Sequence, residues 1–276
     1  MTERGKCTDG LFVSSIVSGS RTAAERVMKR QRIRKFLLLI ALLLFQVKIL
    51  HLFMSPVVPV FAARAGIVSG SLVVYGALFL SSLILGRAFC GWFCPGAAMQ
   101  EILSLVRPTA KAGRADRIKY GICGAWSLLV LGTAIRAGGF HAIDFGFGTQ
   151  HGGILQEFLI RTGHFIVIGA LGAALGAWAS CRYVCWIAPF LVAGSRIRTL
   201  MRIPGLRVAM RGESCSGCEA CREVCPMRVD VDPLVAGPVR SADCILCGNC
   251  VDACPSNSVQ FIWREPPKPL CANRDR

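Results

Sequence analysis

The sequence predicts an α-helical membrane domain with four transmembrane helices, followed by a small, cysteine-rich α+β domain. The chain is 53% hydrophobic with a mean hydropathy of +0.52. Only 17% of its residues are charged, against about 25% in ordinary soluble domains. The apolar residues gather in the first two-thirds, and a repeated cysteine pattern fills the more polar remainder. This shift in composition predicts two parts with different surroundings.

Composition and charge divide the chain into five expected parts. They are a basic N-terminal segment at 1–35, a four-helix transmembrane domain at 36–193, a basic linker at 194–211, the cysteine-rich domain at 212–264 and an irregular tail at 265–276.

The N-terminal segment carries nine Lys and Arg residues and ends at the first apolar run. A short amphipathic helix near 22–35, lying on the lipid surface, is expected from this pattern. The segment is long for the n-region of a cleaved signal peptide, and the apolar run continues past a typical h-region. We therefore expect the first apolar run to be retained as a helix.

Four apolar segments approach the roughly 20 residues that a helix needs to cross a bilayer. They are Phe36–Met54, Gly66–Gly86, Lys119–Arg136 and Thr162–Ala179. The third is short and contains three glycines. The fourth has small residues at 169, 172, 173 and 176, a spacing that lets helices pack closely in lipid.

Positive charge in the connections predicts the orientation. Segments 1–35, 87–119 and 181–211 carry nine, six and six Lys or Arg residues, whereas the two remaining connections are poor in them. Positive loops stay in the cytoplasm. The sequence therefore predicts a multi-pass protein of the bacterial inner (cytoplasmic) membrane, with both termini and the cysteine-rich domain in the cytoplasm. The basic residues lie beside apolar segments, which favours a lipid surface over nucleic acid as the partner of the net charge of +16.

The cysteine-rich domain contains the same run twice, displaced by 29 residues. Each run reads C-x2-C-x2-C-x3-C-P, from Cys215 to Pro226 and from Cys244 to Pro255. This is the ligand run of a bacterial two-cluster ferredoxin, in which the fourth cysteine of each run binds the other cluster. One [4Fe–4S] cluster is therefore expected on Cys215, Cys218, Cys221 and Cys254, and the other on Cys244, Cys247, Cys250 and Cys225.

Strand signals flank the two runs. Leu206, Val208 and Met210 alternate like an entering strand, and Ser258–Trp263 reads as a closing strand. Together they predict a small α+β two-cluster (2[4Fe-4S]) ferredoxin-like domain. Zinc and disulfide alternatives are disfavoured, because zinc sites use separated cysteine pairs and the cytoplasm is reducing.

A second cysteine set follows the second and fourth predicted spans. Cys90 and Cys94 form one C-x3-C pair, and Cys181 and Cys185 form the other. If each segment is helical, the two thiols of a pair lie on one side. Four thiolates at one membrane face could bind an additional metal or cluster, or act as redox thiols, and the alternative is that they are small packing residues.

The segment Gly86–Pro95, the second C-x3-C pair and the double ferredoxin run, in this order, resemble the NapH/MauN type of membrane ferredoxin. Related modules occur in the C-terminal part of NosR and in the assembly factor CcoG. The resemblance covers about residues 36–264. It implies four helices, two C-x3-C-P motifs, two [4Fe–4S] clusters and electron transfer between the quinone pool and periplasmic redox enzymes.

The resemblance also implies partners. These are a methylamine dehydrogenase system for the MauN branch, which we favour, or periplasmic nitrate reduction with a second ferredoxin-type subunit for the NapH branch. Trp186 replaces the proline of the second motif, which departs from the pattern. From a different functional class, a metal- or thiol-reducing maturation factor would also use paired thiolates, since these suit Cu(I).

Other ionisable residues are weaker candidates for a proton or quinone role. They are Lys48, His51, His141, Asp144, His151, Glu157 and His164. An ionisable group inside a membrane is first considered as a functional residue. The alternative for Lys48 and His51 is that their side chains extend to the membrane–water interface. Cys7, Cys123 and Cys271 stand outside both cysteine patterns, and Cys123 is expected to be a small core residue.

Overall fold

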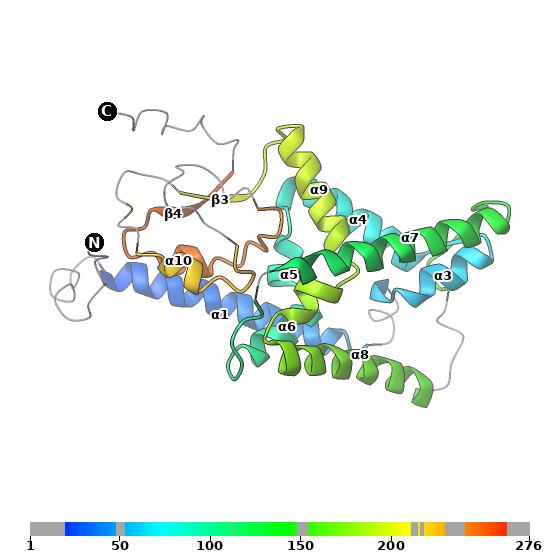
Figure 1. Cartoon of the computed structure of the whole chain (residues 1–276), viewed down its shortest axis with the longest axis horizontal. Helices are drawn as coiled ribbons and strands as arrows, with labels where there is room; N and C mark the ends of the chain where they lie inside the picture. The colour runs from blue at the N-terminus through cyan, green and yellow to red at the C-terminus, as the bar shows by residue number, and fades with distance from the viewer. Residues whose placement is uncertain are drawn as a thin grey trace.

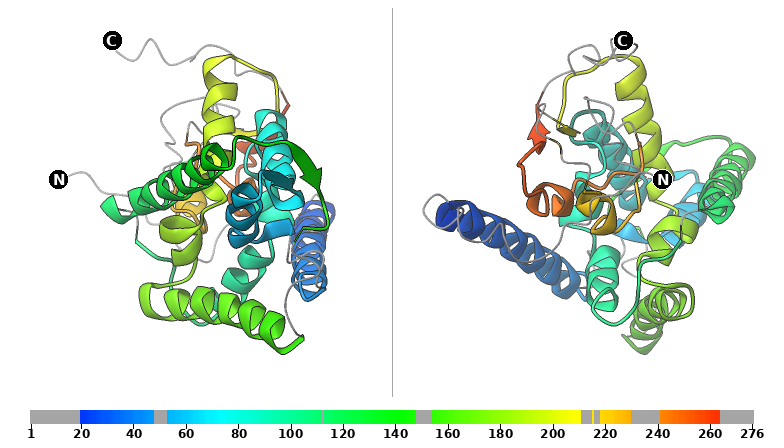
Figure 2. Two further views of the ribbon diagram at one scale, coloured as in Figure 1. Left: turned by 90° about the vertical axis from the view of Figure 1, so that its right-hand side faces the viewer. Right: turned by 60° about the vertical axis from the view of Figure 1, so that its left-hand side comes forward.

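The computed structural model describes residues 20–47, 53–111, 113–147, 154–210, 215, 218–229 and 241–263. Helices make up most of the described chain (Figure 1). A small cysteine-rich part lies along helix α1, Ser20–Leu44, and the two remain side by side when the molecule is turned (Figure 2). The fold thus places the described cysteine-rich part against helix α1.

Helix α1 is continuous through the expected boundary between the basic segment and the first span. A separate amphipathic helix lying on lipid is therefore not observed. Gln31 donates a hydrogen bond to the carbonyl oxygen of Cys247 at 3.2 Å, and Arg30 pairs with Asp252. These polar side chains face the cysteine-rich part, because carboxylate and carbonyl partners there satisfy them better than an apolar surface would.

The other apolar segments also form helices. They are α4 at Gly70–Leu85, α7 at Ile118–Arg136 and α8 at Ile154–Leu175. Helix α3, Val57–Arg64, lies between the first two predicted spans and was not predicted. Among the described residues, one helical stretch, Arg114–Arg136, is long and apolar enough to cross a membrane. This stretch contains the third predicted span, Lys119–Arg136. Gly70–Leu85 and Thr162–Leu175 are apolar but shorter, so the structure supports the four-span prediction only in part.

The connections bring corresponding ends of these helices together. Strand β1, Ile67–Ser69, directly precedes α4 and pairs in parallel with β2, Ala142–Asp144, which follows α7. Helix α9, Ala188–Leu200, packs against α4. Gly194 of α9 allows this packing, because an added Cβ would overlap the Ser82 hydroxyl.

Each C-x3-C pair lies where a helix is interrupted. Cys90 belongs to the short helix α5, Ala88–Trp92, and Cys94 precedes α6, Pro95–Leu103. Cys181 lies in the π-helical turn η2, Ser180–Val184, and Cys185 ends it. The condition for the i, i+4 argument, a regular α-helical segment, is therefore not met by either pair.

The cysteine-rich part contains the two predicted strands. Strands β3, Arg207–Met210, and β4, Val259–Ile262, pair antiparallel with Val208 opposite Phe261. The short helices α10, Ala220–Glu223, and α11, Asn249–Asp252, occupy positions 29 residues apart, as the cysteine runs do. The sequence repeat is thus also a structural repeat.

Candidate iron–sulfur and thiol sites

Four cysteines from both runs surround one small cavity. They are Cys225, Cys244, Cys247 and Cys250, and we name them the inner quartet. The backbone N–H of Val229 points to Cys225 Sγ at 3.4 Å, and Gly248 adopts a left-handed φ of 83° beside Cys247. Soft thiolate donors with N–H groups directed at sulfur are the surroundings that a [4Fe–4S] cluster needs, so the residues present fit the cofactor.

The remaining four cysteines of the runs form the outer quartet: Cys215, Cys218, Cys221 and Cys254. Charge interactions link Cys221 with Cys254 and Cys215, and Cys221 also with Cys250 of the inner quartet. Cys254 Sγ lies 3.5 Å from the Ser256 hydroxyl. Burial acts to raise the pKa of Cys254, but hydrogen bonds from Ser256 and nearby backbone amides bring it below its usual value.

Two observations concern disulfide formation and the binding of a single metal ion by these thiols. Every described cysteine is a free thiol. Within the described ranges, no three His, Cys, Asp or Glu side chains are placed to bind a single metal ion.

The structure brings together the second cysteine set, which we name the helix-end cysteines: Cys90, Cys94, Cys181 and Cys185. Their thiols interact electrostatically across the two pairs. Burial raises the pKa of Cys94 to about 12 and also raises those of Cys181 and Cys185. Without a bound metal such thiols are protonated at neutral pH, which makes them poor partners for thiol–disulfide exchange.

The first C-x3-C motif contacts the inner quartet through its backbone. Gly91 packs so closely on Ile245 that an added Cβ would overlap the Ile245 carbonyl oxygen. Trp92 Nε1 donates to the carbonyl oxygen of Leu246 at 2.9 Å. Both partners lie between Cys244 and Cys247, so the loop that carries two inner cysteines rests directly on the motif.

The second motif reaches the other loop of the inner quartet. Arg182 Nη1 donates to the carbonyl oxygen of Met227 at 2.7 Å, two residues after Cys225. The same guanidinium makes two hydrogen bonds to Asp116, at 3.1 and 2.7 Å. Each C-x3-C motif thus contacts a loop of the inner quartet.

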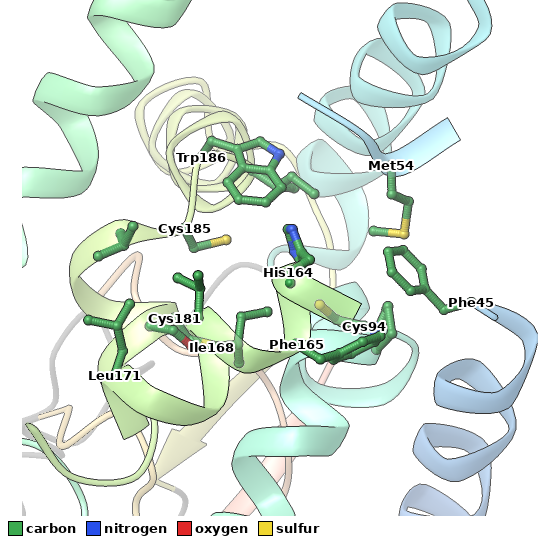
Figure 3. Close-up of a pocket in the computed structure, with 17 residues that line it drawn as sticks. Phe45, Met54, Cys94, His164, Phe165, Ile168, Leu171, Cys181, Cys185 and Trp186 are labelled. Atoms are coloured by element: carbon green, nitrogen blue, oxygen red, sulfur yellow. The ribbon is translucent and has the colours of Figure 1, made fainter. Parts of the chain in front are cut away.

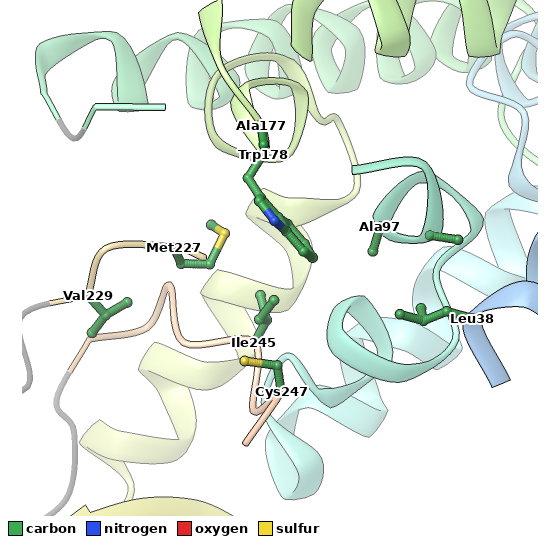
Figure 4. Close-up of a cluster of buried hydrophobic side chains, with 9 residues drawn as sticks. Leu38, Ala97, Ala177, Trp178, Met227, Val229, Ile245 and Cys247 are labelled. Atoms are coloured by element: carbon green, nitrogen blue, oxygen red, sulfur yellow. The ribbon is translucent and has the colours of Figure 1, made fainter. Parts of the chain in front are cut away.

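An apolar cluster fills the space between the two sets. Trp178, 1% exposed, lies between Met227 and Ala97 (Figure 4). Three of the helix-end cysteines and Cys225 pack against this cluster. The interior between the thiol sites therefore excludes water.

Buried cations fix the junction. Asp243, next to Cys244, accepts hydrogen bonds from Arg87 at 2.9 Å and Lys119 at 2.6 Å. Both cationic side chains are 1% exposed. Burial acts to raise the pKa of Asp243, but the positive charges of Arg87 and Lys119 lower it below the usual range. The carboxylate is therefore ionised and holds two helices to the ferredoxin part.

An apolar cavity of about 260 Å³ adjoins the helix-end cysteines. Cys94, Cys181 and Cys185 line it together with His164, Trp186 and Met54 (Figure 3). The Trp186 ring lies edge-on to the His164 ring, 5.0 Å between centroids, and its Nε1 donates to the Tyr75 hydroxyl. The residue that replaces the motif proline therefore forms part of the cavity wall.

The other sequence candidates are distributed differently. Lys48, His51, His151, Cys7 and Cys271 lie outside the described residues. His141 and Asp144 are exposed near the β1–β2 strands, Glu157 lies in α8, and Cys123 is buried, as expected. Of the candidates for proton transfer that are described, His164 alone lines the cavity beside the thiols.

Sequence reasoning missed the charged residues of the junction: Arg34, Arg87, Arg182, Asp243 and Lys119. A signal was present, since Arg87 and Arg182 precede or lie within the C-x3-C motifs and Asp243 precedes Cys244. Charged residues beside apolar helices and ligand cysteines need partners. Pairing them required the fold.

Comparisons with protein families agree with the two cysteine regions. A family described as "4Fe-4S binding domain" matches residues 68–111, which include Cys90 and Cys94. A family described as "4Fe-4S dicluster domain" matches residues 214–259, which include both ferredoxin runs. The chain therefore has two iron–sulfur-type domains.

Curated relatives match over most of the chain. The protein YccM of Escherichia coli is 23% identical over 72% of this chain and 57% of its own length. The ferredoxin-type protein NapH of Haemophilus influenzae is 31% identical over 66% and 64%. The methylamine utilization ferredoxin-type protein MauN of Methylorubrum extorquens is 26% identical over 76% and 74%. The chain spans about three-fifths of the length of the first two, and no solved structure matches it significantly.

Proposed function

Because the chain is homologous to the ferredoxin-type proteins that include NapH, MauN and YccM, we propose that it holds two [4Fe–4S] clusters and passes electrons between a membrane partner and another redox protein. The inner and outer quartets would bind the clusters, which supply one-electron oxidation and reduction. That it is an iron–sulfur electron-transfer protein of this type follows from the homology and from both family matches.

One observation supports this function above the others: both C-x3-C motifs contact the loops of the inner quartet. Gly91 meets Ile245, and Arg182 binds the carbonyl of Met227. A rigid, water-free contact between two cysteine sites suits electron transfer, because fixed groups need little rearrangement when charge moves. The helix-end cysteines would accept or donate electrons at the membrane side as ligands of a further metal or cluster.

The apolar cavity supports a quinone as the membrane partner. It is lined almost wholly by apolar side chains, adjoins three helix-end cysteines and offers His164 as a proton acceptor. In this proposal, His164 would accept the two protons of a bound quinol one at a time and pass them on, and the two electrons would leave one at a time to a metal or cluster held by the helix-end cysteines. Loss of cluster reduction by a short-chain quinol in His164→Phe, but not in His141→Phe at the exposed control position, would support it. Equal rates in both variants would exclude it.

The membrane topology and the metabolic setting of the protein are also proposals. Four transmembrane helices with a cytoplasmic ferredoxin domain remain our proposal for the topology. Methylamine utilisation is one proposed setting and nitrate reduction the other. Identities of 26% to MauN and 31% to NapH do not favour the methylamine branch.

Metal analysis tests the proposal directly. The chain purified without oxygen should be brown and contain roughly eight iron and eight acid-labile sulfide from the ferredoxin domain, plus any metal at the helix-end cysteines. Substituting Cys90 and Cys94 by Ser should leave those eight in place and remove only the additional metal. Stoichiometric zinc without sulfide would contradict the proposal.

A maturation factor is the second candidate, favoured by the soft donors at the cavity: Met54, His164 and three thiols. Such donors suit Cu(I). The Cys90→Ser, Cys94→Ser variant separates the two functions in the cell. A partner enzyme that keeps its cofactor but receives no electrons indicates electron transfer. A partner that lacks its cofactor indicates maturation.

A further inference from the structure

The surroundings of the two cysteine quartets differ in charge. Four arginines, which we name the arginine shell, lie about the inner quartet: Arg30, Arg34, Arg87 and Arg198. They come from α1, from the start of the first C-x3-C motif and from α9, so three separate parts of the chain supply them.

Two members of the shell come from α1. Arg30 pairs with Asp252 of α11, the helix that contains Cys250. The Nε atom of Arg30 lies 3.5 Å from the point that a Cβ on Gly248 would occupy. Arg34 is 0% exposed and donates to the Gly91 carbonyl oxygen. Arg30 interacts electrostatically with Cys250 and Cys247, and Arg34 with Cys247.

The other two members flank Cys244. Arg87 and Arg198 line one cavity together with Cys244. Arg87 donates to both the carbonyl and the carboxylate of Asp243. Arg198 donates to the carbonyl oxygens of Ile84 and Leu206, each at 3.0 Å, and these carry no formal charge. Burial raises the pKa of Cys244 to about 11, while Arg87 and Arg198 act to lower it.

The shell keeps a net positive charge. Arg30 pairs with Asp252 and Arg34 with Glu101, while Arg87 and Lys119 share the single carboxylate of Asp243. The partners of Arg198 are the uncharged carbonyl oxygens of Ile84 and Leu206. In the outer quartet, Cys221 has charge interactions with the thiols of Cys254, Cys215 and Cys250. Hydrogen bonds from Ser256 and backbone amides surround Cys254. Among the described residues, four arginines therefore lie about the inner quartet, and the favourable contacts of Cys254 are hydrogen bonds.

We propose that the arginine shell makes the cluster of the inner quartet the more easily reduced of the two. This inference rests on the proposed function, namely that both quartets bind clusters. Reduction adds one negative charge to a cluster that its thiolates already make anionic, and buried cations stabilise that charge more strongly than exposed ones. One electron then leaves the reduced outer cluster and reduces the inner cluster, beside the helix-end cysteines. Electrons therefore collect at the junction with the helices.

A redox titration followed by electron paramagnetic resonance tests the shell on the full chain, purified without oxygen. Arg30→Gln should lower the reduction potential of the higher-potential cluster by about 59 mV, which is a tenfold fall in its equilibrium constant for one-electron reduction. The potential of the other cluster should not change. Arg30→Lys, which keeps the charge, should restore the higher potential. Arg32→Gln removes the same charge from an exposed position of α1 and should move neither step. Ser256→Ala should lower only the other step.

The outcomes separate this inference from the function beneath it. Both clusters present, with the higher step unmoved in Arg30→Gln or moved equally in Arg32→Gln, would refute the shell and leave electron transfer intact. A shift of the same step by Arg30→Gln and Ser256→Ala would also refute it. A chain without iron and sulfide would refute the proposed function and the shell together.

Discussion

Asp243 shows how one residue joins the two halves of the molecule. Its single carboxylate pairs with both Arg87 and Lys119, which are buried and lie at the starts of different helices. A buried cation without a partner is strongly unfavourable, whereas the intact pair adds little net stability. Asp243 is therefore required for the ferredoxin part to dock on the helices, although the ion pairs themselves add little to the free energy of unfolding.

Replacing Asp243 by Asn should destabilise the protein by about 3 kcal/mol, the lower end for a broken buried pair, because Asp243 itself is 35% exposed and water compensates in part. Denaturant unfolding followed by cluster absorbance measures the change. Glu223→Gln removes an exposed carboxylate of the same domain and should stay within about 0.5 kcal/mol. Equal stability of the two variants would show that Asp243 does not fix the junction.

At the scale of elements, short helices at the ends of long ones determine where the ferredoxin part sits. Helix α5 presents the bare backbone of Gly91 to Ile245, and Trp92 holds Leu246. The π-helical turn η2 directs Arg182 to Met227. The interruptions that contradict regular i, i+4 geometry are thus the places where the docking contacts arise.

Gly91→Ala should destabilise the junction by about 1–3 kcal/mol, because the added methyl group meets a backbone carbonyl that cannot move aside. Hydrogen exchange at the amides of Ile245–Cys247 should accelerate. Gly96→Ala is the matched control, since its nearest neighbour lies 3.6 Å away and alanine favours a helix. Slow exchange at those amides in Gly91→Ala would argue against tight docking.

At the scale of the whole molecule, the two ends of the helical domain have different characters. The β1–β2 pair gathers the connections poor in positive charge, and the helix-end cysteines meet the ferredoxin part among basic residues. This difference in positive charge between the two ends is expected for membrane helices that alternate in direction. Among the described helices, one is long and apolar enough to span a membrane.

Reporter insertions test the proposed topology. A reporter that works only in the cytoplasm should be active after Gly113, and one that works only in the periplasm should be active after Gly139, because positive loops are retained inside. The first position is beside the ferredoxin part and the second beside the β1–β2 pair. Periplasmic activity after Gly113 would overturn the proposed orientation.

Local features of this protein can be predicted from the amino-acid sequence alone. Cysteine spacing predicted the ferredoxin runs, alternation predicted strands β3 and β4, and apolar runs predicted the main helices, because each depends on residues close along the chain. The structural repeat of 29 residues was already visible in the eight cysteines.

Only the tertiary structure decided which distant groups meet. The pairing of Asp243 with Arg87 and Lys119 and the contact of Gly91 with Ile245 join residues more than 100 positions apart. The arginine shell likewise gathers residues from three separate parts of the chain. The sequence indicates that a buried cation needs an ion-pair partner, but several carboxylates in the chain could have been that partner. The choice is made by packing, since the helix ends and the ferredoxin loops must fit together before their charges can pair.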